Sequence, residues 1–255
     1  MTKGAAQRRS WTFYEAVEFN IMTIKDIRKK LQQLGSEEKA KVLQRFFKTG
    51  PGDYGEGDVF IGVGVPQLRK LVKEYPNITI EESVQLLRSR IHEERMFSLL
   101  ILVGKYSKGS ETVKKRIYEL YLQNTKFINS WDLVDGSAHQ IVGDFLMDKS
   151  KEPVYRLAKS KSLWERRIAI LSTFHFIKHD NYSETLKISK ILLTDEQDLI
   201  HKAAGWMLRE IGKRDILTEE IFLKKYYKRM PRTMLRYAIE KFPESKRQKY
   251  LKGKF

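Results

Sequence analysis

The chain of 255 residues carries 49 Lys and Arg against 32 Asp and Glu, which gives a net charge of +17 and an isoelectric point near 9.8. This length suits one large domain or two small ones, and a hydrophobic fraction of 41% excludes a disordered chain. The absence of cysteine excludes disulfides, thiol nucleophiles and cysteine-ligated zinc or iron–sulfur centres. With only five histidines, we expect no metal and no cofactor.

The sequence shows no membrane signal and a strong positive charge. It has no run of about 18 apolar residues and no charged-then-apolar leader, so we expect neither a membrane span nor a signal peptide, and a cytoplasmic protein. A folded body with this charge predicts a polyanionic partner, because neutralisation of phosphates by Lys and Arg is the main sequence-independent source of nucleic-acid affinity. Charge alone does not separate DNA from RNA, the ribosome or an anionic membrane.

Apolar residues recur at intervals of three and four along most of the chain, which predicts helices. In chain order the predicted helices are 23–34, 37–48, 66–75, 95–106, 112–122, 137–146, 166–177, 182–193, 202–211, 218–228 and 233–242. Strand-like alternation is confined to the short stretch Asp58–Val65. The predicted fold class is all-α.

The helices also repeat along the chain. One reference position falls at Arg95, Val134, Arg167, Lys202 and Arg236, at separations of 39, 33, 35 and 34 residues. Helix pairs with this period are typical of an α-solenoid, and the HEAT type is favoured because no TPR consensus is visible. Since four of the five repeats carry a cation there, we predict a line of Arg and Lys along a basic concave groove. The alternative is that each cation belongs to an ordinary solvated helix face.

The positive charge is concentrated near the C-terminus. From Lys202 to Phe255 there are 16 Lys and Arg against 6 Asp and Glu, so +10 of the net charge lies in the last fifth of the chain. We expect part of it to lie in a frayed tail that attracts phosphate without specific geometry.

The densest group of candidate functional residues is Asn129–Ser137. Trp131 and Asp135 are four residues apart, so one helical turn places the ring and the carboxylate on the same face. A lone tryptophan is more often a core residue, and Asp132 and Asp135 could be helix N-caps. A single carboxylate without a second acid or a histidine also lacks the usual acid–base pair.

Two later repeats carry similar combinations of tryptophan and cations. Trp164 lies two residues before Arg166 and three before Arg167, and Trp206 lies four residues after Lys202. Aromatic faces next to cations suit stacked or charged parts of nucleic acids. From the residues alone, the chain is therefore a basic helical-repeat protein that binds nucleic acid, with chemistry at one aspartate left open.

These residues resemble a known family, the bacterial AlkD-like DNA glycosylases, which are DNA alkylation repair enzymes built from HEAT-like repeats. The resemblance runs from about residue 23 to residue 250, and Trp-x-x-x-Asp, Trp-x-x-Arg and Gly-Trp-x-x-Arg-Glu in this order are its strongest part. The matching stretches are PQLRKLVKEY (66–75), SWDLVD (130–135), LWERRIAIL (163–171), HKAAGWMLRE (201–210) and MPRTMLRYAIEKF (230–242).

The resemblance implies hydrolysis of the N-glycosidic bond of N3- and N7-alkylated purines in duplex DNA. It implies that Asp135 is the catalytic carboxylate, that Trp131 and Trp206 are aromatic walls beside it, and that Arg167 holds a phosphate. We expect a cytoplasmic, nucleoid-associated monomer whose partner is double-stranded DNA containing alkylated purines, with a single domain at 23–255 after an N-terminal extension at 1–22. The other expected DNA-binding residues are Arg166, Lys202, Arg95, Arg236, Phe46 and Trp164.

The sequence departs from the family at two places beyond the N-terminal extension. Phe46 stands where family members carry a tyrosine, so a hydroxyl is lost. A Gly-rich insert, Gly50–Asp58, follows, and it lacks the Gly-Lys-Ser/Thr ending of a P-loop. We expect a loop near the groove mouth in which Tyr54 replaces the missing hydroxyl.

Two other functions stay open at this stage. A non-catalytic relative would keep the basic groove and bind structured or damaged DNA without excising a base. A HEAT-type protein scaffold would need an apolar groove instead of a cationic one.

Overall fold

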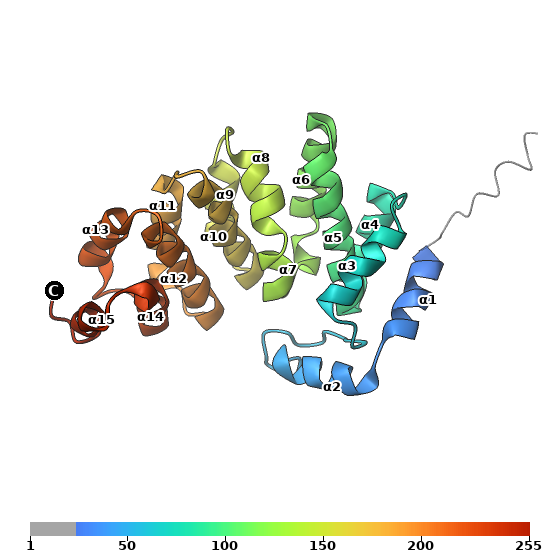
Figure 1. Ribbon diagram of the computed structural model, residues 1–255, viewed down its shortest axis with the longest axis horizontal. Coiled ribbons are helices and arrows are strands. Elements are labelled where there is room, and N and C mark those ends of the chain that lie inside the picture. Colours follow the sequence, from blue (N-terminus) through green and yellow to red (C-terminus); the bar gives the residue numbers. More distant parts are fainter. Residues whose placement is uncertain (1–23) are drawn as a thin grey trace, which may run out of the picture.

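The computed structural model describes residues 24–255, so the expected N-terminal extension lies outside the described residues. Helices follow one another along an arch, with α1 at one end and α13 to α15 at the other (Figure 1). The helices are α1 (Ile24–Leu34), α2 (Glu37–Phe46), α3 (Val65–Glu74), α4 (Ile80–Leu87), α5 (His92–Lys108), α6 (Glu111–Gln123), α7 (Trp131–Asp135), α8 (Asp144–Leu146), α9 (Glu152–Ala158), α10 (Leu163–Lys178), α11 (Ser183–Ile191), α12 (Asp198–Gly212), α13 (Ile216–Tyr226), α14 (Arg232–Ala238) and α15 (Glu244–Leu251).

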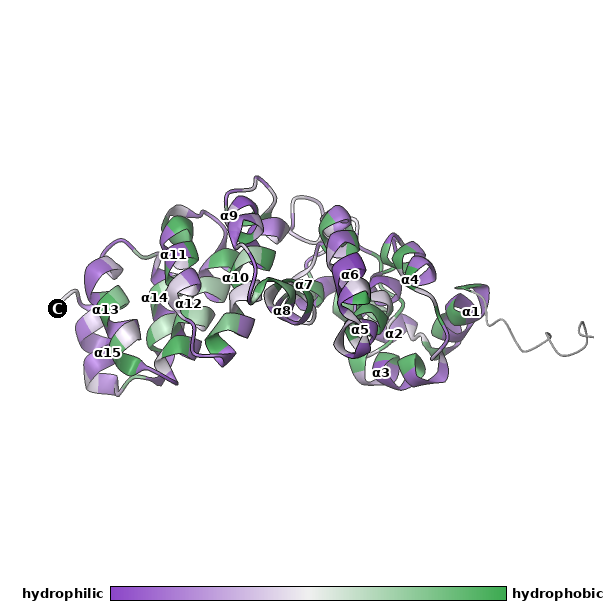
Figure 2. Ribbon diagram, turned by 90° about the horizontal axis from the view of Figure 1, so that it is seen from above, coloured by the Kyte–Doolittle hydropathy of each residue, from purple (hydrophilic) through white to green (hydrophobic). Residues whose placement is uncertain are grey.

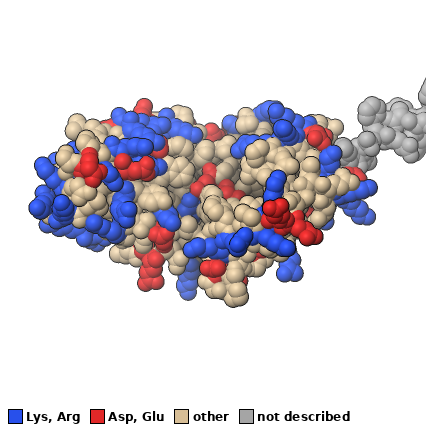
Figure 3. Space-filling model, turned by 60° about the horizontal axis from the view of Figure 1, so that its bottom comes forward, with Lys and Arg blue, Asp and Glu red and all other residues tan. Residues whose placement is uncertain are grey.

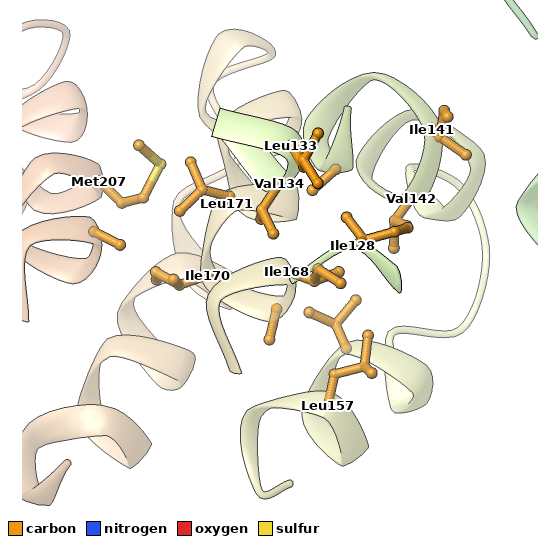
Figure 4. Packing of buried hydrophobic residues seen from close by; sticks show 14 of the residues in the cluster. Ile128, Leu133, Val134, Ile141, Val142, Leu157, Ile168, Ile170, Leu171 and Met207 are labelled. Atoms are coloured by element: carbon orange, nitrogen blue, oxygen red, sulfur yellow. The ribbon is translucent and has the colours of Figure 1, made fainter. Parts of the chain in front are cut away.

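The predicted all-α solenoid is confirmed. Each long helix packs on the helices of neighbouring repeats: α5 on α3 and α4, α10 on α9 and α12, and α12 on α14. Their apolar sides face one another, and the polar sides face outward (Figure 2). At the centre, Leu133 and Val134 of α7 lie against Ile168 and Leu171 of α10, all fully buried (Figure 4). The core thus runs along the arch from repeat to repeat.

Gly205 explains how closely two of these helices approach. A Cβ atom there would lie 2.4 Å from the carbonyl oxygen of Met234 and 2.6 Å from Cβ of Tyr237, which is too close for any larger residue. The glycine therefore allows α12 to lie directly on α14. As a result, Trp206 is held beside the helix that carries Tyr237.

Several predicted elements differ from the structure. The helix predicted at 137–146 is interrupted, because a π-helical turn at His139–Gly143 separates α7 from α8. Asp58–Val65 is extended but forms only one isolated bridge, Val59 with Ile91, and residues 24–255 contain no strand. The prediction of a frayed C-terminal tail is wrong, because residues 244–251 form α15 and the side chain of Tyr250 is only 1% exposed. The helices α4, α9 and α15 were not predicted.

Across residues 24–255, none of the helices has the length and apolar character needed to cross a membrane.

Candidate nucleic-acid interface

The central groove is a cavity of about 620 Å³ between the segment that follows α2 and the ends of α7, α10, α12 and α14. Four of its side chains are cations and one is a carboxylate, so the lining has a net positive charge, although Arg167, Lys202 and Arg209 are each paired with a carboxylate in or beside it. Its lining residues are Phe46, Lys48, Tyr54, Trp131, Arg167, Gln197, Asp198, Leu199, Lys202, Trp206, Arg209 and Tyr237. The structure therefore brings together five residues expected at the site, from four different helices.

Asp135 ends α7 and is held by one of these lining residues, Arg167 of α10. Arg167 donates to both carboxylate oxygens, from Nε to Oδ1 at 2.9 Å and from Nη2 to Oδ2 at 2.8 Å. The Asp135 side chain is 19% exposed, whereas that of Arg167 is 6% exposed. Burial raises the pKa of Asp135 above its ordinary value, and the adjacent Arg167 only partly opposes this. The carboxylate is thus fixed in orientation and partly stripped of water.

Arg167 makes a third contact that anchors it. Its Nη1 donates to the carbonyl oxygen of Leu199, 2.5 Å away, just before the reference position of the next repeat. Because Arg167 makes three hydrogen bonds to Asp135 and Leu199, its guanidinium group is not a free phosphate-binding group. It forms part of the groove wall and orients Asp135.

Aromatic rings form both sides of the groove. Trp131 stacks on Phe47 with ring centroids 5.2 Å apart, and Phe46 meets Trp131 edge-on at 6.0 Å. On the other side, Trp206 packs at 5.9 Å from Phe174, and its indole N–H donates to Glu210 at 3.1 Å. These contacts fix both tryptophans while leaving them in the lining. Phe46, 62% exposed, presents its ring to solvent at the groove edge.

The Gly-rich insert reaches into the groove. Tyr54 is one of the lining residues, and its ring meets Trp164 of α10 edge-on at 6.1 Å. Its hydroxyl is 3.5 Å from the carbonyl oxygen of Phe46. Trp164 itself is not part of the lining. The Tyr54 hydroxyl thus lies at the backbone of Phe46, and its replacement of the family hydroxyl stays a prediction.

The predicted continuous line of cations is not formed. Arg95 is 4% exposed and donates to Asp58 at 2.7 Å, and Arg166 donates to Asp195 at 2.5 Å. Arg236 is exposed but lies outside the lining. Only Lys202 and Arg167 of the reference position reach the groove. Arg95 and Arg167 point toward the preceding repeat and bind the carboxylates of Asp58 and Asp135 instead of facing solvent.

Charge on the outer surface is distributed unevenly. Figure 3 shows Lys and Arg gathered over the end of the molecule that carries the C-terminal helices, with carboxylates visible in the middle of the same face.

His175 and His179 stand one helical turn apart with rings 4.5 Å from each other. Within residues 24–255, however, no group of three or more His, Asp and Glu could hold a metal ion.

Sequence reasoning missed several groove residues. Lys48, Arg209 and Tyr237 line it; Lys48 and Tyr237 had no signal beyond proximity to Phe46 and Arg236, whereas Arg209 is the arginine of the Gly-Trp-x-x-Arg-Glu motif and was given no role. It also missed His92, which is buried behind Trp131 and bridges two carboxylates. A single histidine at the start of a helix gave no sign of this role.

The chain matches known proteins over most of its length. The family model described as DNA alkylation repair enzyme covers residues 27–242. A solved structure, a predicted DNA alkylation repair enzyme from Enterococcus faecalis, has a TM-score of 0.63 and 18% sequence identity, and the match covers 82% of this chain and 97% of that chain. At this identity the likeness shows the fold. No curated protein matches the sequence.

Proposed function

The chain belongs to the DNA alkylation repair enzyme family, and from this we propose that it is a DNA glycosylase that releases cationic N3- and N7-alkylated purines from duplex DNA. The observation that carries the proposal is the Asp135 carboxylate, which is held at a fixed angle by Arg167 beside a positive, aromatic groove. A buried carboxylate facing a phosphate-rich ligand costs free energy. Its placement here is best explained by a positive charge that develops during a reaction.

The chemistry requires only one carboxylate. An alkylated purine is already cationic, so it leaves with the electron pair of the N-glycosidic bond as a neutral base, and no general acid is needed. The sugar then carries positive charge at C1′, which Asp135 stabilises electrostatically. A water molecule forms the new C–O bond at C1′ and gives up its proton to the carboxylate or to solvent. Preorganised charge of this kind lowers the barrier by roughly 3–4 kcal/mol.

The groove suits the backbone of a duplex. Trp131 and Trp206 present flat apolar faces on either side, and Lys202 offers an ammonium group for a phosphate. Lys202 is paired with Asp198 at 2.7 Å, so binding DNA replaces one anionic partner with another. The Tyr54 hydroxyl supplies the hydrogen-bonding group that Phe46 lacks. The proposed substrate places the enzyme with the nucleoid, and one chain supplies the whole groove, so the proposal requires only a monomer.

One observation favours a second candidate, a non-catalytic DNA-binding protein. Both Asp135 oxygens are already bonded to Arg167, and a carboxylate neutralised in this way stabilises a cation less well. In that case the pair would serve to join α7 to α10, and the groove would recognise only the shape and charge of DNA.

Measuring base release from methylated duplex DNA separates the two candidates. The wild-type protein is expected to release 7-methylguanine and 3-methyladenine faster than the spontaneous rate under single-turnover conditions. Unmethylated DNA of the same sequence is the control. Tight binding with release only at the spontaneous rate would exclude the glycosylase and leave the DNA-binding candidate.

A further inference from the structure

His92 lies between two carboxylates in the interior. It is the first residue of α5 and is 3% exposed. Its Nδ1 is 2.8 Å from Oδ2 of Asp58, and its Nε2 is 2.9 Å from Oδ2 of Asp132. Carboxylates at neutral pH only accept hydrogen bonds, so both ring nitrogens must carry protons. The geometry therefore requires a charged imidazolium.

This imidazolium connects the two parts of the chain that carry the N-terminal side of the groove. Asp58 ends the insert that presents Tyr54, and Asp132 lies in the first turn of α7 between Trp131 and Asp135. The two parts are otherwise joined by aromatic packing, and the ring of His92 takes part in it. It stacks on Phe60 at 4.3 Å and lies 5.2 Å from Phe47, which in turn stacks on Trp131.

The charges around His92 balance. Asp58 receives a second cation, because Arg95 of α5 donates to the same oxygen at 2.7 Å. Two carboxylates thus face two cations. The side chains of Asp58, His92 and Arg95 are sealed, whereas that of Asp132 is 15% exposed and has His92 as its only ion-pair partner among the described residues. The two acids that follow His92 on α5 have other partners: Glu93 accepts from the backbone N–H groups of 61–63, and Glu94 accepts from Arg28 of α1 at 3.1 Å.

The charge on Asp132 also reaches Asp135. The two carboxylates are on the same short helix, and the negative charge of Asp132 adds to burial in raising the pKa of Asp135, against the opposing effect of Arg167. The hydroxyl of Tyr121, on α6, is the other titratable group near Asp135. If His92 lost its charge, Asp132 would stand unpaired three residues from Asp135.

We propose that His92 is a positioning residue of the site: its imidazolium fixes the insert against α7 and neutralises Asp132, so that Asp135 remains ionised and correctly placed. This inference rests on the proposed glycosylase function. It assigns no direct contact between His92 and DNA, because Trp131 and Phe47 lie between His92 and the groove.

The test is the pH profile of base release for His92→Gln, with Asp132→Asn as the matched isosteric control. In His92→Gln the unpaired Asp132 is expected to move the acid limb of the rate to higher pH by about one unit. The maximal rate should fall about 10- to 100-fold, with the dissociation constant for DNA nearly unchanged. Asp132→Asn should move the acid limb to lower pH, and the double variant should bring it back toward the wild type.

A merely structural role would scale the rate without moving the acid limb, and that result in all three variants would overturn the proposal. If His92→Gln does not fold, a ¹⁵N-histidine NMR titration of the wild type gives an independent answer. Both ring nitrogens of His92 should be protonated at pH 7.5: burial lowers its pKa, but the hydrogen bonds to Asp132 and Asp58 outweigh burial and raise the pKa of His92 to about 9. A neutral ring at pH 7.5 would overturn the proposal.

The proposed function and this inference can fail separately. If the wild type releases no base at any pH, the glycosylase is excluded. The ¹³C-carboxyl titration of Asp135 then still compares wild type with Asp132→Asn. A lower pKa of Asp135 in the variant supports the coupling, and an unchanged one overturns it.

Discussion

Two arginine–aspartate pairs occupy equivalent places in the solenoid but differ in exposure. Arg95 and Arg167 both stand at the reference position of their repeats, and each donates to the carboxylate of an earlier segment. In the first pair both side chains are sealed, at 4% and 3% exposure. In the second pair the arginine is 6% exposed, but Asp135 is 19% exposed. The same pairing thus closes one site and leaves the other accessible.

The two carboxylates also titrate in opposite directions. Although burial alone would raise it, the hydrogen bond from His92 and the charge of Arg95 hold the pKa of Asp58 below its ordinary value. Burial raises the pKa of Asp135 and the charge of Asp132 adds to this, while Arg167, its only ion-pair partner among the described residues, opposes them only partly. Two cations make Asp58 a structural group, whereas Asp135, with one, keeps electrostatic capacity for a positive charge on a ligand.

Breaking the sealed pair should have the largest effect. Arg95→Ala leaves Asp58 buried with one partner fewer and is expected to lower the free energy of unfolding by about 3–5 kcal/mol. Arg167→Ala leaves a carboxylate that water can reach, so the loss should be about 1–2 kcal/mol. Urea denaturation of both variants measures the difference. Equal losses would contradict the comparison.

The pH dependence of stability should reveal the cluster around His92. The pKa of His92 is about 9 in the folded protein against an ordinary value of 6.5, so its contribution is complete below pH 6.5 and is lost as pH rises through about 9. The loss should be on the order of 3 kcal/mol. Denaturation curves between pH 6 and 10 check this, with His92→Gln as the control that should lack the decline. If the free energy of unfolding of the wild type depended on pH as little as that of His92→Gln, this prediction would be contradicted.

Acid should act on the two carboxylates with opposite signs. The lowered pKa of Asp58 gives stability that is lost as pH falls below its ordinary value of 3.8. The raised pKa of Asp135 favours the folded state at low pH, and this contribution is lost as pH rises through the folded value. Asp58→Asn should therefore flatten acid unfolding, whereas Asp135→Asn should steepen it. The same change in both variants would show that the two sites do not differ.

The smallest effect is expected from single groove cations. Lys202→Ala should weaken DNA binding equally for damaged and undamaged DNA, and should reduce the slope of log K against log salt by about one. Arg236→Ala is the comparison, because this exposed arginine lies outside the groove. An equal change in slope for Arg236→Ala would restore the line of cations that the repeat spacing predicted.

The sequence predicts the fold better than the site. The 3.6-residue periodicity and the spacing of Arg95, Arg167 and Lys202 identify the helical repeats, because repeating units must bury the same face. The same spacing misplaces Arg95, since a cation at a fixed phase points either to solvent or to a neighbouring carboxylate, and the expected DNA-binding residue Arg166 is misplaced for the same reason. Asp58 and Asp195, which decide this, are far away in sequence.

The interrupted helix shows the same limit. His139–Gly143 is π-helical, and Gly143 lies against α10, where a Cβ would be 2.3 Å from the carbonyl oxygen of Ser172. Packing between repeats sets this geometry. The local apolar periodicity does not report that packing, so it predicted one continuous helix. The four-residue spacing placed Trp131 and Asp135 correctly on one helical turn, but neither the spacing nor the family resemblance indicated that Arg167 pairs with Asp135.

The single-turnover rate of base release by Asp135→Asn tests the central claim most directly. The amide keeps the shape of the side chain, so the DNA dissociation constant should change little, while the rate should fall about 10²- to 10³-fold. Trp131 and Arg167 are intact in this variant, so the rest of the groove is preserved. Release at the wild-type rate by Asp135→Asn would contradict the account, because the reaction would then not depend on the Asp135 carboxylate.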